Sequence, residues 1–407
     1  MIPVHSACLS WRRRLGRLVV LSLAMCALLL APLASQALEN GLARTPPMGW
    51  NSWNRFGCKN VNEKVVRAAA DAMVSSGMKA AGYQYIVIDD CWQIGRDAAG
   101  NILADPKSYP SGIKALADYV HSKGLKFGIY TDAGVKTCAG RPGSLGHEYQ
   151  DAAQYARWGV DFVKEDWCNT VPGQDSEASY TVMRNALAAT GRPIVFSICE
   201  WGSTKPWLWA GPIGNMWRAA GDIQNCWSCQ RTWGGHGVLQ IIDLMDSIYS
   251  YSGPGHWNDP DMLEVGNGGM TDAEYRAHFS LWALFSAPLI SGNDISQMSE
   301  ATKEILLNKE VIAVDQDPMG IQGHRVQKDG DLEVWSKQLS DGGRAVVLLN
   351  RSDKPATITA DWTAIGYPSK LKAQVRDLWL HQDMAPHTGS YAAEVPGDAA
   401  VMVRITP

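Results

Sequence analysis

From Gly49 to about Glu300 the chain alternates between two kinds of segment, and this alternation limits the possible folds more than any other feature. Short runs rich in β-branched and aromatic residues are each followed by an amphipathic stretch rich in alanine and leucine. The predicted strands are Met48–Trp53, Tyr83–Trp92, Lys126–Asp132, Asp161–Trp167, Pro193–Trp201, Asn215–Asp222, His256–Asp261 and Pro288–Asp294. Helical patterns between them include Glu63–Ser76, Ile113–Lys123, His147–Trp158, Thr181–Ala189, Val238–Tyr249 and Ala273–Phe285. Eight strands alternating with helices over roughly 250 residues predict an α/β fold of the (β/α)8 TIM-barrel type.

A doubly wound open sheet is the competing topology. Such a sheet normally carries a glycine-rich phosphate-binding turn after its first strand, and this chain has none there. The run Gly266-Asn267-Gly268-Gly269 follows the seventh predicted strand and is expected to shape a loop. The barrel is therefore the favoured topology, over residues 38–320.

The pattern changes near Asp315, and short alternating segments follow from Ile321 onward. The predicted strands of this region are Glu333–Gln338, Arg344–Leu349, Ala356–Thr359, Leu371–Asp377 and Val401–Ile405. Turn signals such as Asp329-Gly330 and Asp341-Gly342-Gly343 separate them. We expect residues 321–407 to form a small C-terminal antiparallel β-sandwich domain without a catalytic cluster of its own.

The N-terminal segment has the pattern of a secretory signal peptide. Four arginines precede an apolar run from Leu18 to Leu33, and Ser35-Gln36-Ala37 resembles a cleavage site. We expect residues 1–37 to be removed and the protein to be secreted or periplasmic. The apolar run is short for a permanent membrane span, and no other stretch could cross a bilayer. A lipoprotein attached through Cys26 is a weaker alternative.

The charge and composition restrict the partners of the chain. The formal net charge is −4, and the predicted cleavage removes four arginines, so the mature chain is more acidic still. An acidic surface without basic runs argues against a nucleic-acid partner. No membrane association is expected after cleavage, and the sequence does not determine the oligomeric state.

Seven cysteines follow the predicted cleavage site: Cys58, Cys91, Cys138, Cys168, Cys199, Cys226 and Cys229. Export would favour disulfides, and the odd number leaves at least one thiol unpaired. Cys226 and Cys229 form a lone C-x-x-C without a second pair at zinc-finger spacing. A local disulfide is therefore favoured over a metal site.

Carboxylates end most of the predicted barrel strands, and the C-terminal ends of barrel strands are where TIM-barrel active sites lie. These strand-end acids are Asp89 and Asp90, Asp132, Asp166, Glu200, Asp222, and Asp259 with Asp261. A single aspartate after a strand is usually a helix cap or a turn residue. Acids at six of eight strand ends, most with a tryptophan or tyrosine beside them, are hard to explain by capping alone.

Such a rim could bind a cation or a sugar. A catalytic metal in a hydrolytic barrel usually needs closely spaced histidines, and none of the nine histidines has H-x-H or H-x-x-x-H spacing. Carboxylates accept hydrogen bonds from sugar hydroxyls, and aromatic rings stack on the apolar face of a sugar ring. The 17 tryptophans of the chain favour carbohydrate as the ligand. No metal and no cofactor are expected.

Glycoside cleavage needs two carboxyl groups in opposite protonation states. Lys164 lies two residues before Asp166 on the same strand face and would favour the ionised form of a nucleophile there. Asp222 ends the strand two places further on, and neighbouring acids could raise its affinity for a proton. We therefore predict Asp166 as nucleophile and Asp222 as acid/base, about 5–5.5 Å apart as retention of configuration requires.

Several motifs resemble glycoside hydrolase family 27, the family of α-galactosidases and α-N-acetylgalactosaminidases. They run in order through the whole barrel: Pro47-Met-Gly-Trp-Asn-Ser-Trp, Ile88-Asp-Asp-Cys-Trp, Phe127-Gly-Ile-Tyr, Val163-Lys-Glu-Asp-Trp-Cys, Cys199-Glu-Trp-Gly, Trp217-Arg and Trp257-Asn-Asp-Pro-Asp-Met-Leu. The C-terminal part resembles the β-sandwich of the family with weaker motifs.

The resemblance implies a retaining α-galactosidase with Asp166 as nucleophile and Asp222 as acid/base. The sugar-binding positions that it implies are Trp50, Asp89, Asp90, Tyr130, Lys164, Glu200, Trp201, Arg218 and Asp261. It also implies the disulfides Cys58–Cys91 and Cys138–Cys168. Glu165 lies between Lys164 and the nucleophile, should point away from the barrel mouth, and is assigned no catalytic role.

Substrate choice in the family depends on the loop after the fifth strand, where N-acetylgalactosaminidases carry small residues. The bulky pair Glu200-Trp201 is of the galactosidase type. The alternatives are an α-N-acetylgalactosaminidase or β-L-arabinopyranosidase of the same family and, from a different class, a sugar-binding barrel without catalysis. The natural α-galactoside, an oligosaccharide, a galactomannan or a glycoconjugate, is not determined by the sequence.

Overall fold

The computed structural model describes residues 37–407. The predicted signal peptide therefore lies outside the described residues, apart from Ala37 itself. None of the helices in the described part of the chain is long and apolar enough to cross a membrane.

Eight parallel strands form the central sheet, as the alternating pattern predicts. They are β1 Met48–Asn51, β2 Tyr85–Val87, β5 Lys126–Asp132, β6 Phe162–Asp166, β7 Val195–Cys199, β8 Met216–Arg218, β9 Trp257–Asp259 and β10 Leu289–Ser291. Their spatial order is β10-β1-β2-β5-β6-β7-β8-β9. The chain just after β9 returns to β10, because Leu263 forms a parallel bridge with Ser291. This bridge links the two outer strands of the sheet.

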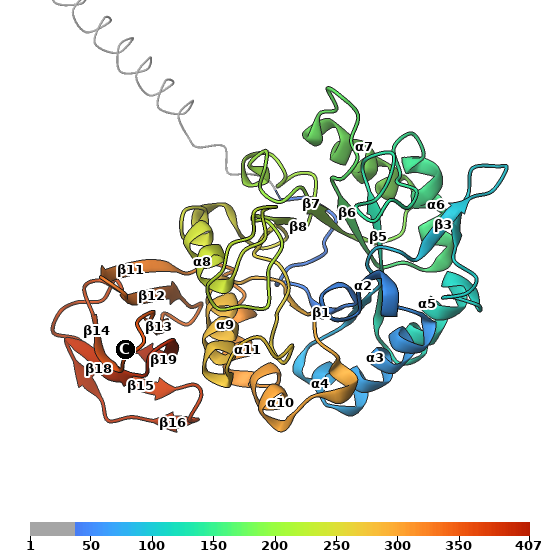
Figure 1. Ribbon diagram of the computed structural model, residues 1–407. Coiled ribbons are helices and arrows are strands. Elements are labelled where there is room, and N and C mark those ends of the chain that lie inside the picture. The colour runs from blue at the N-terminus through green and yellow to red at the C-terminus, as the bar shows by residue number, and fades with distance from the viewer. Residues whose placement is uncertain (1–36) are drawn as a thin grey trace, which may run out of the picture. The chain divides into compact units, whose positions relative to one another are not determined.

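Helices follow most of the strands and cover the outside of the sheet (Figure 1). They are α2 Trp53–Asn60, α3 Glu63–Ser75, α4 Met78–Ala81, α5 Gly112–Ser122, α6 Glu148–Trp158, α7 Ser176–Ala189, α8 Val238–Asp246, α9 Asp272–Leu284, α10 Glu300–Leu306 and α11 Lys309–Asp315. Three 3-10 turns lie at Pro206–Leu208, Tyr249–Tyr251 and Ile295–Gln297. A small hairpin, β3 Gln93–Arg96 and β4 Ile102–Ala104, is inserted after β2. Between β7 and β8 the structure has the short turn at Pro206–Leu208 and no α-helix.

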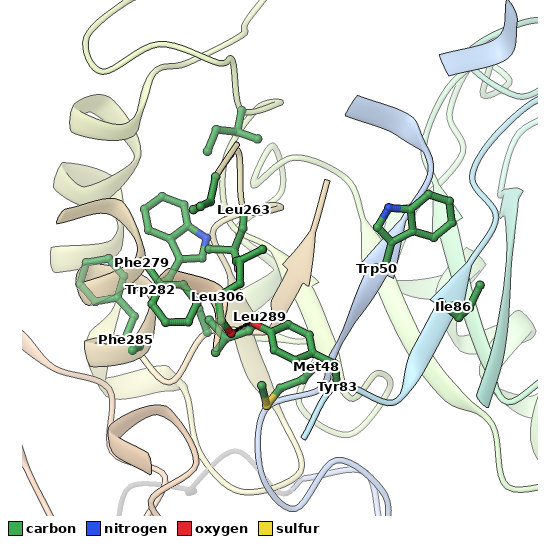
Figure 2. Packing of buried hydrophobic residues seen from close by; sticks show 14 of the residues in the cluster. Met48, Trp50, Tyr83, Ile86, Leu263, Phe279, Trp282, Phe285, Leu289 and Leu306 are labelled. Carbon is green, nitrogen blue, oxygen red and sulfur yellow. Dashed lines mark hydrogen bonds between the residues drawn. The ribbon is translucent and has the colours of Figure 1, made fainter. Parts of the chain in front are cut away.

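Two apolar layers hold the barrel together. Alternate residues of the strands point inward, and the inner layer consists of Tyr85, Val87, Phe162, Val195, Met216 and Trp257. The outer layer lies between strands and helices and includes Trp50 and Ile86, which are partners on β1 and β2 (Figure 2). Burial of this apolar surface is the main favourable term in folding. Strand parity therefore determines which side chains can reach the barrel mouth.

The C-terminal strands form two antiparallel sheets that share an apolar core. One contains β11 His324–Asp329, β12 Leu332–Gln338, β13 Arg344–Asn350, β19 Ala399–Thr406, β15 Lys372–Asp377 and the short β16 Gln382–Asp383, with β17 His387–Thr388 beside β15. The other pairs β14 Ala356–Asp361 with β18 Ser390–Val395. The predicted boundary at Gly320 and Ile321 falls in the connection between α11 and β11.

Helix α9 and the C-terminal sheet share one core. Trp335 of β12 packs edge-on against Phe285 at the end of α9, with ring centroids 5.6 Å apart. The ammonium group of Lys337, buried on the same strand, donates hydrogen bonds to Ser286 Oγ at 2.6 Å and to the Val314 carbonyl at 2.5 Å. The C-terminal strands therefore support the helix that follows β9.

Candidate active site

A cleft of about 950 Å³ opens at the C-terminal ends of the barrel strands. The predicted residues that line it are Asp89, Asp90, Tyr130, Lys164, Asp166, Trp201, Arg218, Asp222 and Asp261. They come from β2, β5, β6, β7, β8 and β9 or from the residues directly after these strands. Parallel strands end at a common rim, so side chains that are far apart in sequence meet in one cleft.

Trp50 does not line this cleft, so its prediction as a sugar-binding residue is wrong. Its indole is fully buried in the outer apolar layer, and its N–H donates to the Asn293 carbonyl at 2.8 Å. The neighbouring Asn51 points inward instead and donates to Asp89 Oδ2 at 2.8 Å. Side chains alternate along a strand, so Trp50 and Asn51 cannot both face the mouth.

Trp53, at the end of the motif Pro47-Met-Gly-Trp-Asn-Ser-Trp, lines the cleft. It was not predicted from the sequence as a site residue. The predicted strand runs to Trp53, but the observed strand ends at Asn51 because the Asn51 side-chain oxygen accepts a hydrogen bond from the Trp53 N–H at 2.8 Å. That local turn starts α2 and redirects Trp53 to the rim. The asparagine two residues before Trp53 is a signal that could have identified it.

Glu200 is also absent from the cleft lining. Its carboxylate is buried and turns back into its own loop, where it accepts hydrogen bonds from the Thr204 N–H at 2.6 Å and the Thr204 hydroxyl at 3.0 Å. Trp201 and Ser203 of the same loop do line the cleft. The prediction of Glu200 as a sugar-binding residue is therefore wrong, and its carboxylate stabilises the loop that presents Trp201.

Asp166, at the end of β6, is held by two donors. The Tyr130 hydroxyl donates to Oδ2 at 2.9 Å and the Trp167 N–H donates to Oδ1 at 3.1 Å. Burial raises the pKa of Asp166 to about 6. Lys164 acts to lower this pKa, in agreement with the prediction, but burial outweighs it. Asp222 and Asp89 add to the increase, since a second negative charge nearby disfavours ionisation. The carboxyl group therefore titrates in the mildly acidic range.

Asp222 stands at the open edge of the cleft, with a side chain that is 41% exposed. Burial acts to raise the pKa of Asp222, but Arg218 and Lys164 outweigh it, and the pKa is lowered. The Arg218 guanidinium lies 3.0 Å from Asp222 Oδ1 and 2.7 Å from Asp261 Oδ2. The prediction that neighbouring acids raise the proton affinity of Asp222 is therefore wrong, because the buried Arg218 guanidinium favours the ionised form.

A second buried cation organises the opposite part of the site. Lys164 lies 2.9 Å from Asp89 Oδ2, which also accepts the hydrogen bond from Asn51. The adjacent Asp90 accepts hydrogen bonds from the Ala139 N–H at 2.9 Å and the Cys91 N–H at 2.6 Å. Burial raises the pKa of Asp90. These carboxylates are fixed in direction before any ligand arrives.

The backbone turns sharply where several site residues are presented. Cys91, Trp201 and Asp261 have φ angles of 78°, 60° and 82°, in the left-handed region that side chains other than glycine rarely occupy. Asp261 keeps this conformation with hydrogen bonds from the Ile223 N–H at 2.8 Å and the Met262 N–H at 2.7 Å. Such strain persists only where surrounding contacts hold it, and it is concentrated at functional sites.

The disulfides Cys58–Cys91 and Cys138–Cys168 join the pairs that the resemblance implies, and Cys226–Cys229 closes the local C-x-x-C. Among the described residues Cys199 is the free cysteine, and it is buried beside Arg218. Asp132 and Asp166 meet Cys138 and Cys168 in a group with metal-ligand spacing, but both sulfurs are in a disulfide. They are therefore not thiolate ligands.

Glu165 does not line the cleft and is buried. Burial raises its pKa well above the ordinary value for glutamate, and Asp132, Glu148 and Asp151 add to the effect. These surroundings favour the neutral form of the carboxyl group. Glu165 therefore faces away from the barrel mouth, as its place on the strand between Lys164 and Asp166 predicts.

An acidic cleft with aromatic walls at the mouth of a barrel is the site of a glycoside hydrolase, and comparison with known proteins agrees. Residues 45–317 match the family described as "Alpha galactosidase A", and residues 329–405 match "Alpha galactosidase C-terminal beta sandwich domain". An α-galactosidase A from Cellvibrio japonicus is 57% identical over 342 residues, which cover 83% of this chain and 83% of that protein.

An α-galactosidase from Cyamopsis tetragonoloba is 54% identical over 371 residues, which cover 91% of this chain and 88% of that protein. The crystal structure of α-galactosidase I from Mortierella vinacea is 40% identical with a TM-score of 0.88, and the match covers 90% of this chain and 98% of that one. The chain therefore belongs to the α-galactosidase family, glycoside hydrolase family 27.

The different positions of Trp50 and Trp53 can be tested by stability. Trp50→Ala leaves a cavity in the outer layer and is expected to lower the free energy of unfolding by about 3–5 kcal/mol. Trp53→Ala removes a half-buried ring at the rim and is expected to change it by less than about 1 kcal/mol. Denaturant unfolding of both variants checks this. Equal losses for the two would contradict the assignment of Trp50 to the core and Trp53 to the cleft.

Proposed function

We propose that this protein is a retaining exo-α-galactosidase that hydrolyses terminal α-D-galactosyl residues of oligosaccharides, polysaccharides or glycoconjugates by double displacement. The observation that carries the proposal is the pair Asp166 and Asp222, which line one cleft and interact closely enough for the charge of Asp222 to raise the pKa of Asp166. Two such carboxyl groups are what glycoside cleavage requires.

In the first step an Asp166 carboxylate oxygen attacks the anomeric carbon. The bond from that carbon to the leaving-group oxygen breaks, and Asp222 transfers its proton to that oxygen. The product is a galactosyl ester of Asp166 with inverted configuration and a free alcohol from the leaving group. Tyr130, which donates to Asp166 Oδ2, orients the carboxylate for this attack.

In the second step Asp222, now a carboxylate, takes a proton from water as the water oxygen attacks the anomeric carbon. The ester bond breaks, the electron pair returns to Asp166, and Asp222 is protonated again. Two inversions at one carbon give net retention. The buried cations Lys164 and Arg218 offset the negative charge of the other acids throughout.

The remaining cleft residues suit a galactosyl ring. Asp89, Asp90 and Asp261 offer fixed acceptors for hydroxyl groups, and Trp53 and Trp201 offer aromatic surfaces. The bulk of Trp201, which lines the cleft, supports a galactoside as substrate, because a bulky side chain at this position of the cleft wall would exclude an acetamido group by steric contact. Glu200, which was expected to contribute to this wall, does not reach the cleft.

Export from the cytoplasm is part of the proposal. Three disulfides among residues 37–407 support an oxidising destination, in agreement with the predicted signal peptide. We propose a secreted or periplasmic enzyme with no cofactor.

Proton NMR of the first-formed sugar during cleavage of an α-galactoside tests activity and stereochemistry together. We expect α-galactose to appear first and the β-anomer to follow by mutarotation. β-Galactose as first product would contradict double displacement. Turnover of only the α-N-acetylgalactosaminide or β-L-arabinopyranoside in a nitrophenyl glycoside panel would favour those alternatives. Binding without turnover of any glycoside would favour a sugar-binding barrel.

Asp166→Asn should bind galactose with nearly unchanged affinity and lose turnover, because an amide cannot form the glycosyl ester. A loss of several orders of magnitude in kcat is expected. The measurement pairs galactose titration with initial rates on melibiose, and mass spectrometry excludes deamidation back to aspartate. Glu165→Gln is the matched control at the neighbouring position, since that side chain does not line the cleft. Substantial residual hydrolysis by Asp166→Asn would refute the nucleophile assignment.

The pH dependence follows from the two carboxyl groups. The reactive state needs Asp166 ionised and Asp222 protonated, whereas the pKa of Asp166 is raised to about 6 and that of Asp222 is lowered. The reactive state is therefore a minor form of the singly protonated pair. It disappears when both groups are protonated at low pH, and also when both are ionised above about pH 6.

We accordingly expect a bell-shaped profile of kcat/KM with its maximum on the acidic side and an alkaline limb near pH 6. Initial rates on an α-galactoside at low substrate concentration, measured across the acidic and neutral range, check this. Circular dichroism at each pH serves as the control for folding. Constant kcat/KM through neutral pH would contradict the assigned order of proton affinities.

A further inference from the structure

The loop from Asp222 to Gly237 carries a residue that the proposed mechanism does not use, Trp233. Two bridges close this loop, Ile223 with His236 and Gln230 with His236. The Cys226–Cys229 disulfide lies within it, and the carbonyl groups of both cysteines accept hydrogen bonds from the first N–H groups around α8. The loop is therefore a braced structure anchored to the barrel.

Trp233 lies on this loop, lines the cleft and is 62% exposed. It is the only exposed tryptophan among residues 37–407. A large aromatic side chain left in water loses the stabilisation that burial would provide. Trp233 lies at the rim of the cleft, where the ring of a bound sugar could stack on the indole and cover its exposed surface.

Two close backbone approaches at glycines shape the part of the loop around Trp233. A Cβ atom at Gly235 would lie 2.7 Å from Cη2 and 2.9 Å from Cζ2 of Trp233, so the ring rests directly against the Gly235 backbone. Gly221 is packed still more closely, because a Cβ atom there would lie 2.0 Å from the Gly234 carbonyl oxygen. The residue after Trp233 therefore touches the residue before Asp222, which brings the backbone that carries Trp233 close to the backbone that carries Asp222.

We propose that Trp233 forms the platform of the leaving-group subsite, on which the pyranose ring linked to the galactosyl unit stacks. This inference rests on the proposed function, because it takes Asp222 as the group that protonates the glycosidic oxygen. That oxygen joins the galactosyl ring to the leaving group, so surface lying next to Asp222 and further out at the rim faces the leaving group. Trp233 is exposed and lines the same cleft as Asp222, and its neighbour Gly234 packs against Gly221, so it offers such a surface.

Polar groups beside the indole complete a surface suited to a sugar. Gln224 and His236 line the same part of the cleft. Burial lowers the pKa of His236, and Arg218 lowers it further, which favours the neutral imidazole. A neutral imidazole and an amide both donate and accept hydrogen bonds, as sugar hydroxyls require. The subsite therefore favours a sugar as leaving group over a small alcohol.

The test compares two substrates that share the galactosyl ring. Melibiose carries a pyranose leaving group, whereas α-galactosyl fluoride has no ring to stack. Loss of one aromatic contact of about 0.5–1.5 kcal/mol corresponds to a roughly two- to tenfold effect. Trp233→Ala should lower the ratio of kcat/KM for melibiose to kcat/KM for the fluoride by that factor, and Trp233→Phe should restore most of it. Leu380→Ala, at a similarly exposed residue that does not line the cleft, is the control and should leave the ratio unchanged.

Binding separates failure of this inference from failure of the proposed function. In the Asp166→Asn background, Trp233→Ala should weaken melibiose binding and leave galactose binding unchanged. If galactose does not bind at all, the proposed function fails. If galactose binds but Trp233→Ala affects both sugars equally, or neither, the platform role of Trp233 is overturned.

Discussion

A parallel barrel gathers aspartates from neighbouring strands at one rim, and two buried cations counter the repulsion that results. Lys164 pairs with Asp89, and Arg218 bridges Asp222 and Asp261. Each cation is itself costly to desolvate, so removing an acid partner would leave an uncompensated buried charge. The arrangement fixes side-chain directions and also sets the order of proton affinities. Asp222, in contact with Arg218, has a lowered pKa, whereas burial raises the pKa of Asp166.

The site is built where strands stop, and short local turns determine what each strand end presents. The Asn51 side chain ends β1 and starts the turn that exposes Trp53. Glu200 braces the loop in which Trp201 adopts a left-handed backbone. The loop that carries Asp222 and Trp233 is held together by close backbone packing between Gly221 and Gly234. Strand β6 thus positions Asp166, the loop after β8 carries Asp222, and both side chains line the same cleft.

The barrel was predictable because its signal is repeated. Eight short apolar runs alternate with amphipathic stretches, and each run is long enough to be recognised. The hydrogen-bonded barrel strand β5 has the predicted bounds, and the other seven are shorter than predicted. The strands β11 His324–Asp329 and β18 Ser390–Val395 were not predicted. Both are only partly buried, so neither shows the regular alternation of apolar and polar residues that identifies a strand. Edge positions of this kind depend on partners that the local sequence does not reveal.

The sequence by itself determined the barrel and the set of acids at its mouth. The alternation of strands and helices and the residues that end each strand can be read locally, and parallel strands place their ends at one rim. Only the tertiary structure decided which aromatic and acidic neighbours face the cleft. Trp50 and Glu200 were misassigned because hydrogen bonds to Asn293 and Thr204 turn them away. It also decided the proton affinities of Asp166 and Asp222, since these depend on burial and on charges from strands distant in sequence. Side-chain direction and desolvation are properties of packed neighbours, which no single segment encodes.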